Sequence, residues 1–273
     1  RAGGGAGAVA GVLQVLTLMW LRTTMNYQYR NGGTTKEAIQ TLYKEGGVAR
    51  FYQGLGFALV QQPLSRFGDT AANVGSMMLL GSMAATSELP VFVQTAVGSA
   101  AASLWRIALM PVDTFKTTMQ VKGASGVDAL RAKVDANGFG ALFEGSGATL
   151  ASTFVGNYPW WATYNTLQVT VPPMDDGSLL TKLARNAAIG LAASCTSDIV
   201  SNSLRVTKTV KQTAEEKVSY RKTVTLILKE DGYSGLFGRG LKTRLITNGM
   251  QGMLFSVLWK LFDETYLKAN GVK

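Results

Sequence analysis

An acidic and a basic residue stand three positions apart near the middle of the chain, where they could form an ion pair. Asp113 and Lys116 follow Pro111 within the segment Met-Pro-Val-Asp-Thr-Phe-Lys-Thr-Thr-Met-Gln of residues 110–120. Proline lacks an N–H and clashes with the preceding turn, so the sequence predicts a kinked helix here. Residues three apart lie on one side of a helix, so Asp113 and Lys116 should lie together. A kinked amphipathic helix would by itself explain this motif.

A cation followed by a similar four-residue segment occurs three times along the chain. Arg22 is followed by Thr-Thr-Met-Asn, Lys116 by Thr-Thr-Met-Gln and Lys208 by Thr-Val-Lys-Gln, at intervals of 94 and 92 residues. Each cation is also followed, after a short amphipathic segment, by a glycine near an aromatic residue, namely Gly54, Gly145 and Gly240. Internal repetition of this length outweighs any local motif in deciding the fold. We expect three repeats, approximately 1–86, 87–177 and 178–273.

The composition is that of a helical membrane protein. Charged residues make up 16% of the chain and hydrophobic residues 47%, whereas charged residues are about 25% of an average soluble domain. The 31 glycines suit helices that pack closely in lipid. A soluble all-α protein with a large core remains the alternative, because no stretch has ~18 uninterrupted apolar residues. Polar interruptions are expected if each helix has one face on lipid and one on an aqueous cavity.

The positive charges alternate along the chain. The net charge is +10, and 19 of the 27 lysines and arginines lie in residues 22–53, 116–144 and 204–244. The connecting segments 78–90 and 168–180 contain none. Basic loops that alternate with neutral or acidic ones are typical of a helical bundle in a membrane. A nucleic-acid-binding surface would more often be one continuous basic face, so we predict no nucleic-acid partner.

The residue types that most often carry out catalysis are scarce. The single cysteine, Cys195, excludes an internal disulfide, and the chain has no histidine, the commonest general base and metal ligand. The sequence contains no recognisable pair of a nucleophile and a base and no metal-binding cluster. We therefore predict that the protein is not an enzyme and that it needs no metal or cofactor.

The repeated motifs resemble those of the mitochondrial carrier family, over essentially all 273 residues. Units of that family carry Pro-x-Asp/Glu-x-x-Lys/Arg and, later, an acid-glycine and an aromatic-cation-glycine element. The resemblance implies a single all-α membrane domain of residues 1–273, with six tilted transmembrane helices and three short surface helices in three pseudo-symmetric repeats. The expected spans are 1–30, 54–80, 91–112, 146–168, 187–204 and 245–262. The expected surface helices are 34–45, 127–137 and 220–231.

In the family, three acid–cation pairs form a ring that closes the matrix side of the cavity. The acid positions here are Met19, Asp113 and Arg205, and the cation positions are Arg22, Lys116 and Lys208. Gln120 and Gln212 follow two of the cations by four residues. One acid therefore faces four cations, and a ring of three pairs is not expected. The positions of the opposite gate are Val74/Met77, Asn165/Gln168 and Lys260/Asp263, of which only the last pair is charged, with reversed sign.

The resemblance also places substrate contacts midway along the even-numbered helices. The polar candidates there are Gln61, Arg66, Asp69, Asn73, Ser152, Thr153, Thr247 and Asn248. An ion pair between Arg66 and Asp69 explains those two residues equally well. In the family the positions of Gly54, Gly145 and Gly240 help to bind cardiolipin, which we expect as a bound lipid. A tight turn would also explain these glycines.

Two functions remain open at this stage. The first is transport of a small anionic metabolite across the mitochondrial inner membrane, with degenerate ion-pair gates. The second is a transport-inactive adaptor, or an accessory subunit of a larger membrane protein complex. The expected partners are cardiolipin together with either the metabolite or that complex. The inner membrane is the expected location, with the plastid envelope and the peroxisomal membrane as alternatives. We rank transport first, because most proteins with these repeats transport a solute.

Overall fold

The fold is helical throughout the part of the chain that the structure describes. The computed structural model describes residues 3–82, 91–172 and 179–254. Its α-helices are α1 (Gly3–Asn31), α2 (Thr35–Phe51), α3 (Leu55–Ser82), α4 (Val91–Ala108), α5 (Met110–Lys122), α6 (Gly126–Asn137), α7 (Ser146–Thr170), α8 (Leu179–Thr213) and α9 (Tyr220–Gly238). Two short 3-10 helices are η1 (Gly123–Ser125) and η2 (Phe139–Phe143), and residues 241–254 form a further helical segment. The predicted all-α class is thus confirmed.

Within the described ranges, no helix combines the length and the apolar character needed to cross a membrane.

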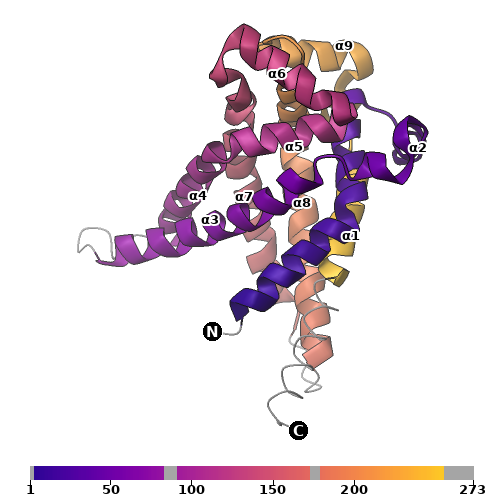
Figure 1. The fold of residues 1–273 in the computed structure, drawn as a ribbon. Coiled ribbons are helices and arrows are strands. Elements are labelled where there is room, and N and C mark those ends of the chain that lie inside the picture. Colours follow the sequence, from indigo (N-terminus) through magenta and orange to yellow (C-terminus); the bar gives the residue numbers. More distant parts are fainter. Residues whose placement is uncertain (1–2, 83–90, 173–178, 255–273) are drawn as a thin grey trace.

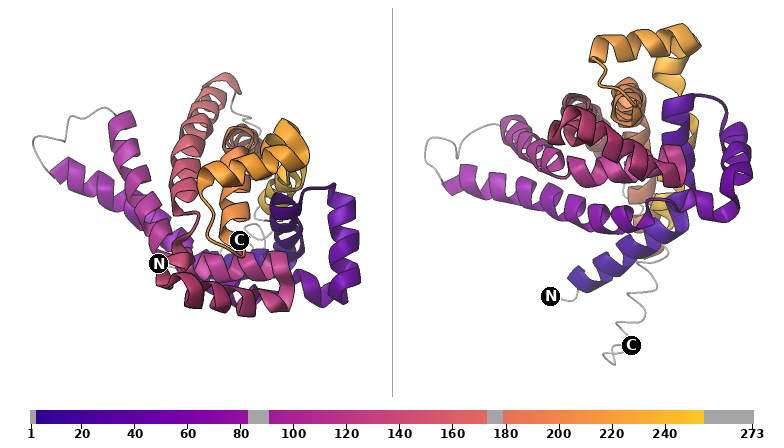
Figure 2. Two further views of the ribbon diagram at one scale, coloured as in Figure 1. Left: turned by 90° about the horizontal axis from the view of Figure 1, so that it is seen from above. Right: turned by 45° about the horizontal axis from the view of Figure 1, so that its top comes forward.

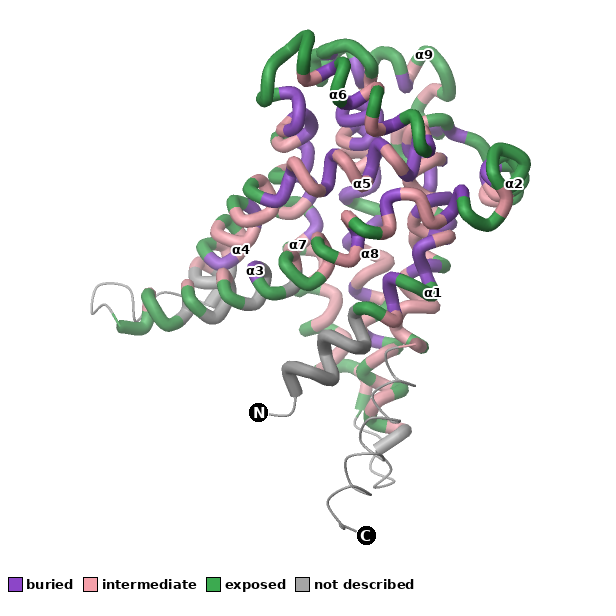
Figure 3. Tube along the Cα trace, in the orientation of Figure 1, coloured by how far each residue is buried: buried purple, intermediate pink, exposed green. Residues whose placement is uncertain are grey.

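Three helices from different repeats meet at one end of the molecule. α1, α5 and α8 contact one another in pairs, and α2, α6 and α9 gather around this end, which we call the surface-helix end (Figures 1 and 2). α3 and α4 lie side by side and extend away from the other helices, and α7 packs along α8. Most buried residues lie towards the surface-helix end, as Figure 3 shows. This end is therefore the most closely packed part of the described structure.

The predicted kink at Pro111 separates two helices, with Leu109 between them. α4 ends at Ala108, and α5 begins at Met110 with the proline in its first turn. Proline is tolerated in a first turn because the N–H that it lacks would have no partner there. Asp113 therefore lies in the first turn of α5, where a carboxylate is favoured by the helix dipole. Pro63 lies inside α3, as expected.

The three surface helices are present at the predicted positions, and their ends follow from local sequence. Thr34 and Glu37 form a capping box at the start of α2, with Glu37 N donating to Thr34 Oγ1. The Thr34 backbone N–H also donates to Glu37, and this hydrogen bond lowers the pKa of the exposed Glu37 carboxyl. Gly46 and Gly47 have non-helical backbone angles and interrupt α2, and Gly232 interrupts α9 in the same way.

Two features of the position before α3 require glycine there: the backbone conformation and a close neighbouring atom. Gly54 has a φ of +86°, and a Cβ added to it would lie 3.0 Å from the backbone oxygen of Lys116. Side-chain-bearing residues rarely adopt this left-handed conformation. The turn thus lets the start of α3 approach the backbone of α5.

We expect the substitution Gly54→Ala to lower the free energy of unfolding by about 1–2 kcal/mol, the cost of a left-handed L-residue. Gly56→Ala is the matched control, because Gly56 lies in the helical part of α3 and a Cβ there meets nothing within 4 Å. Chemical denaturation of both purified variants tests this prediction. Equal stability of the two variants would contradict it.

Candidate functional site

A single carboxylate joins two repeats at the surface-helix end. Asp113 Oδ1 lies 2.6 Å from Lys116 Nζ, and its Oδ2 lies 2.6 Å from Lys208 Nζ in α8. The Asp113 residue is buried, with 7% of its surface exposed. The predicted Asp113–Lys116 pair is therefore present, and Lys208 of the third repeat joins it. With Arg22, Gln120 and Gln212, these residues form what we call the gate cluster.

The amides that follow the motif cations form a second layer of contacts. Gln212 Nε2 donates to Thr114 Oγ1 at 2.8 Å and lies 3.4 Å from Asp113 Oδ2. Asn26 Nδ2 of α1 donates to Gln120 Oε1 at 2.6 Å. Gln120 also approaches the sulfur of Met19, at the acid position of the first repeat. Amides from the first and third repeats thus contact α5, which carries the carboxylate.

α1 contributes to the gate cluster without any acid of its own. Arg22 Nη1 donates to Gln62 Oε1 of α3 at 2.8 Å, and Lys116 Nζ donates to Gln61 Oε1 at 3.0 Å. Gln61, a substrate-contact candidate, therefore lies beside the gate cluster. Gln62 is a neighbour that the motif analysis missed, because uncharged residues carry no signal for an ion-pair ring.

The expectation that one acid faces four cations is wrong, because a second acid lies two helical turns before the third motif. Asp198 Oδ1 lies 2.6 Å from Arg244 Nε and 3.4 Å from Arg205 Nη2. Its other oxygen accepts a hydrogen bond from Asn248 Nδ2. Mapping by fixed motif positions overlooked Asp198, although a lone acid within residues 187–204, an expected span, was a visible signal.

The site nevertheless carries excess positive charge. Among the described side chains, two carboxylates contact four cations in two groups: Asp113 with Lys116 and Lys208, and Asp198 with Arg205 and Arg244. Like charges close together in a partly dry environment repel one another strongly. The arrangement can therefore attract an anion.

The remaining substrate-contact candidates differ in what they contact. Ser152 and Thr153 both donate to the carbonyl oxygen of Thr149, and Thr247 donates to that of Thr243. These hydroxyls are used within their own helices. Asn248 instead contacts Asp198, as described above. The side chains of Arg66, Asp69 and Asn73 lie outside the described residues, so those predictions stay open.

At the opposite-gate position Gln168, the described structure shows a set of hydrogen bonds from one arginine, which we call the Arg185 clasp. Arg185 of α8 donates to Gln168 Oε1 at 2.8 Å and to the backbone oxygens of Gln168, Val171 and Pro172. The guanidinium thereby satisfies carbonyl groups at the end of α7, which have no partner within the helix. The side chains of Val74 and Met77, and both Lys260 and Asp263, lie outside the described residues.

The three glycines predicted to bind cardiolipin, Gly54, Gly145 and Gly240, precede α3, α7 and the helical segment 241–254. Gly145 caps α7 with a φ of +90°, and a Cβ there would lie 3.3 Å from the backbone oxygen of Lys208. A Cβ on Gly240 would lie 2.7 Å from the ring of Tyr29. Turn geometry and close packing explain these glycines, and cardiolipin binding stays a prediction.

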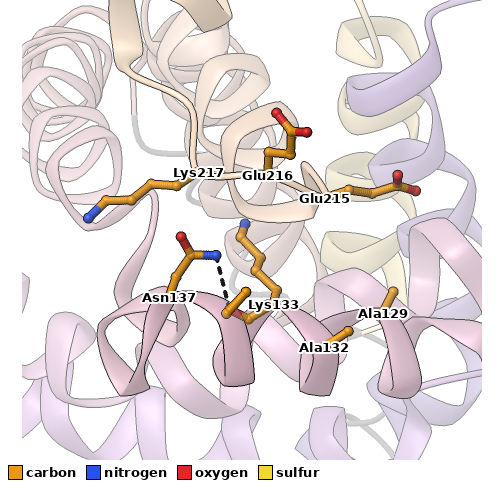
Figure 4. Close-up of a pocket in the computed structure, with 8 residues that line it drawn as sticks. Ala129, Ala132, Lys133, Asn137, Glu215, Glu216 and Lys217 are labelled. Carbon is orange, nitrogen blue, oxygen red and sulfur yellow. Dashed lines mark hydrogen bonds between the residues drawn. The ribbon is translucent and has the colours of Figure 1, made fainter.

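Two cavities lie away from the gate cluster. One, of about 350 Å³, separates α6 from residues 215–217 and has an alanine wall formed by Ala129, Ala132 and Ala136 (Figure 4). Glu215 at its rim pairs with Lys122, which donates a hydrogen bond to it and lowers its pKa. The other, of about 410 Å³, is an apolar groove between α3 and α4. Neither cavity is lined by a residue of the gate cluster.

We expect Asp113→Asn to lower the free energy of unfolding by about 3–5 kcal/mol, because two partly buried lysines would lose their counter-ion. The exposed Asp135→Asn is the control and should change it by less than about 0.5 kcal/mol. Denaturation of both variants in the same detergent provides the measurement. A similar small change in both would show that the carboxylate does not hold the helices together.

Two segments of the chain match a known family. The family model described as Mitochondrial carrier protein matches residues 87–174 and 181–270, more than half of the chain. No curated protein matches the chain. The matched segments contain Asp113, Asp198 and the cations that pair with them. The chain therefore belongs to the mitochondrial carrier family, whose members are transporters rather than enzymes.

Proposed function

We propose that the protein transports a small anionic metabolite across the mitochondrial inner membrane. The observation that carries this proposal is the excess positive charge around Asp113 and Asp198, where two carboxylates contact four cations among the described side chains. A cluster of one charge sign with low-dielectric surroundings raises the local concentration of the opposite ion. An anionic solute is the ligand that this charge favours.

The contacts that close the surface-helix end differ between the repeats. Lys208–Asp113 is an ion pair between two repeats, whereas α1 is joined through amides such as the Asn26–Gln120 pair. An anion that binds Lys208 or Lys116 competes with Asp113 for the same ammonium groups. Binding would therefore weaken the contact between α5 and α8, and this gives the solute a direct means of opening the closed end.

The first test is a thermal-shift screen of the full chain in detergent against phosphate, nucleotides, di- and tricarboxylates and amino acids. A solute at 100 times its dissociation constant should stabilise the folded state by about 2.7 kcal/mol. Lys208→Gln should abolish the shift, because it removes a cation of the gate cluster. Lys222→Gln, an exposed residue of α9, is the control and should leave it unchanged.

Uptake of the selected solute into liposomes then tests transport itself. We expect uptake that saturates with solute concentration in the unsubstituted protein and is lost in Lys208→Gln. Absence of a thermal shift for every anionic solute, together with absence of uptake, would overturn the proposal.

The second candidate function is a transport-inactive adaptor, favoured by the Arg185 clasp. Its hydrogen bonds fasten the end of α7 to α8, and the Gln168 side chain that accepts one of them occupies an opposite-gate position. If the clasp regulates transport, Arg185→Gln should change the uptake rate at least several-fold. If neither the unsubstituted protein nor the Arg185→Gln variant takes up solute, and a defined membrane complex copurifies with them, the adaptor is favoured instead.

A further inference from the structure

Asp198 serves two guanidinium groups at once and neutralises only one of them. A single oxygen, Oδ1, faces both Arg244 and Arg205, while Oδ2 is used by Asn248. At least one positive charge beside Asp198 therefore has no matching carboxylate among the described residues.

The two guanidiniums also retain donors that their contacts do not use. Arg205 donates from Nε to Ser201 Oγ and faces Asp198 through Nη2, and the other contact of Arg244 is a long one to the sulfur of Met25. A guanidinium has five N–H donors. Both side chains remain partly open to solvent, with exposed fractions of 23% and 20%.

A buried hydroxyl without a partner lies at the same place. Tyr29 of α1 is 2% exposed and packs with Val206, Val210 and Ile227. Its Oη faces the Arg244 guanidinium, yet it forms no hydrogen bond of good geometry with any described group. A buried hydroxyl without a partner costs free energy, which a ligand that accepts its proton would recover.

We propose that Arg205, Arg244 and Tyr29 form an oxyanion site next to Asp198, which binds the charged group of the solute. This inference rests on the proposed transport of an anionic solute and adds the residues that recognise it. Guanidinium groups match the geometry of carboxylate and phosphate oxygens, which is the chemistry the site requires. Asp198 competes for the same donors and so sets how tightly the oxyanion binds.

Phosphate and malonate are suitable probes, because each carries an oxyanion and little else. Titration of the full chain in phospholipid-free detergent, followed by its melting temperature, gives an apparent dissociation constant for each probe. Arg244→Gln should raise that constant about tenfold, the effect of losing one charge-assisted contact. Asp198→Asn should lower it at least threefold, because the internal competitor loses its charge. The exposed Arg221→Gln is the charge control and should leave it unchanged.

Tyr29→Phe gives a test that does not depend on how the charged variants fold. The ring and its packing remain, and the hydroxyl that is lost has no partner, so the melting temperature without probe should stay the same or rise. The apparent dissociation constant for phosphate should rise about threefold, as expected for one lost hydrogen bond. Tyr43→Phe, at a 60% exposed position, is the matched control.

The outcomes separate this site from the proposed function. Binding that is weakened by Lys208→Gln, but unchanged in Tyr29→Phe and Arg244→Gln, would overturn the oxyanion site and leave the proposed transport intact. Absence of any oxyanion effect on any variant would overturn both. A parallel titration with short-chain phosphatidic acid identifies the source of the oxyanion. If Tyr29→Phe raises the apparent dissociation constant of that lipid but not of phosphate or malonate, the site binds a lipid headgroup.

Discussion

The Asp113 carboxylate is the contact on which the arrangement of helices at the surface-helix end depends. Its oxygens accept hydrogen bonds from two ammonium groups of different repeats, and the Gln212 amide also approaches it. A buried carboxylate is stable only when it is paired and hydrogen-bonded, so its position fixes the positions of its partners. The break at Pro111 makes this possible, because it places Asp113 in the first turn of a new helix.

Asp198 supplies a carboxylate to the third repeat, whose motif has no acid of its own. The third repeat has Arg205 where an acid is expected, and Asp198 pairs with that arginine from two turns away on α8. The same carboxylate also reaches Arg244, so it connects α8 to the helical segment 241–254. The pair thereby acts within one repeat, whereas Lys208 acts between repeats. Asp113 therefore connects two repeats, whereas Asp198 connects helices within the third repeat.

Much of the fold could be predicted from sequence, because it rests on spacing and on local signals. The repeated cations placed Arg22, Lys116 and Lys208 at equivalent positions, and the three surface helices lie where they were expected. Asp198 and Gln62 could not be found in this way, because their roles arise from packing between helices distant in sequence. Spacing within one repeat identifies the residues on a helix face, but not which neighbouring helix that face meets.

α8 is an uninterrupted helix of 35 residues, in contrast to the broken α4–α5 pair. Arg185 lies near its start and Lys208 near its end, about 35 Å apart at the usual helical rise. Because the helix is continuous, a rotation at one end displaces the other end. A tilt of about 5° around the Arg185 clasp would move Lys208 by about 3 Å at this rise per residue. Such a displacement exceeds the 2.6 Å contact with Asp113, so a small rotation at one end is enough to separate charges at the other.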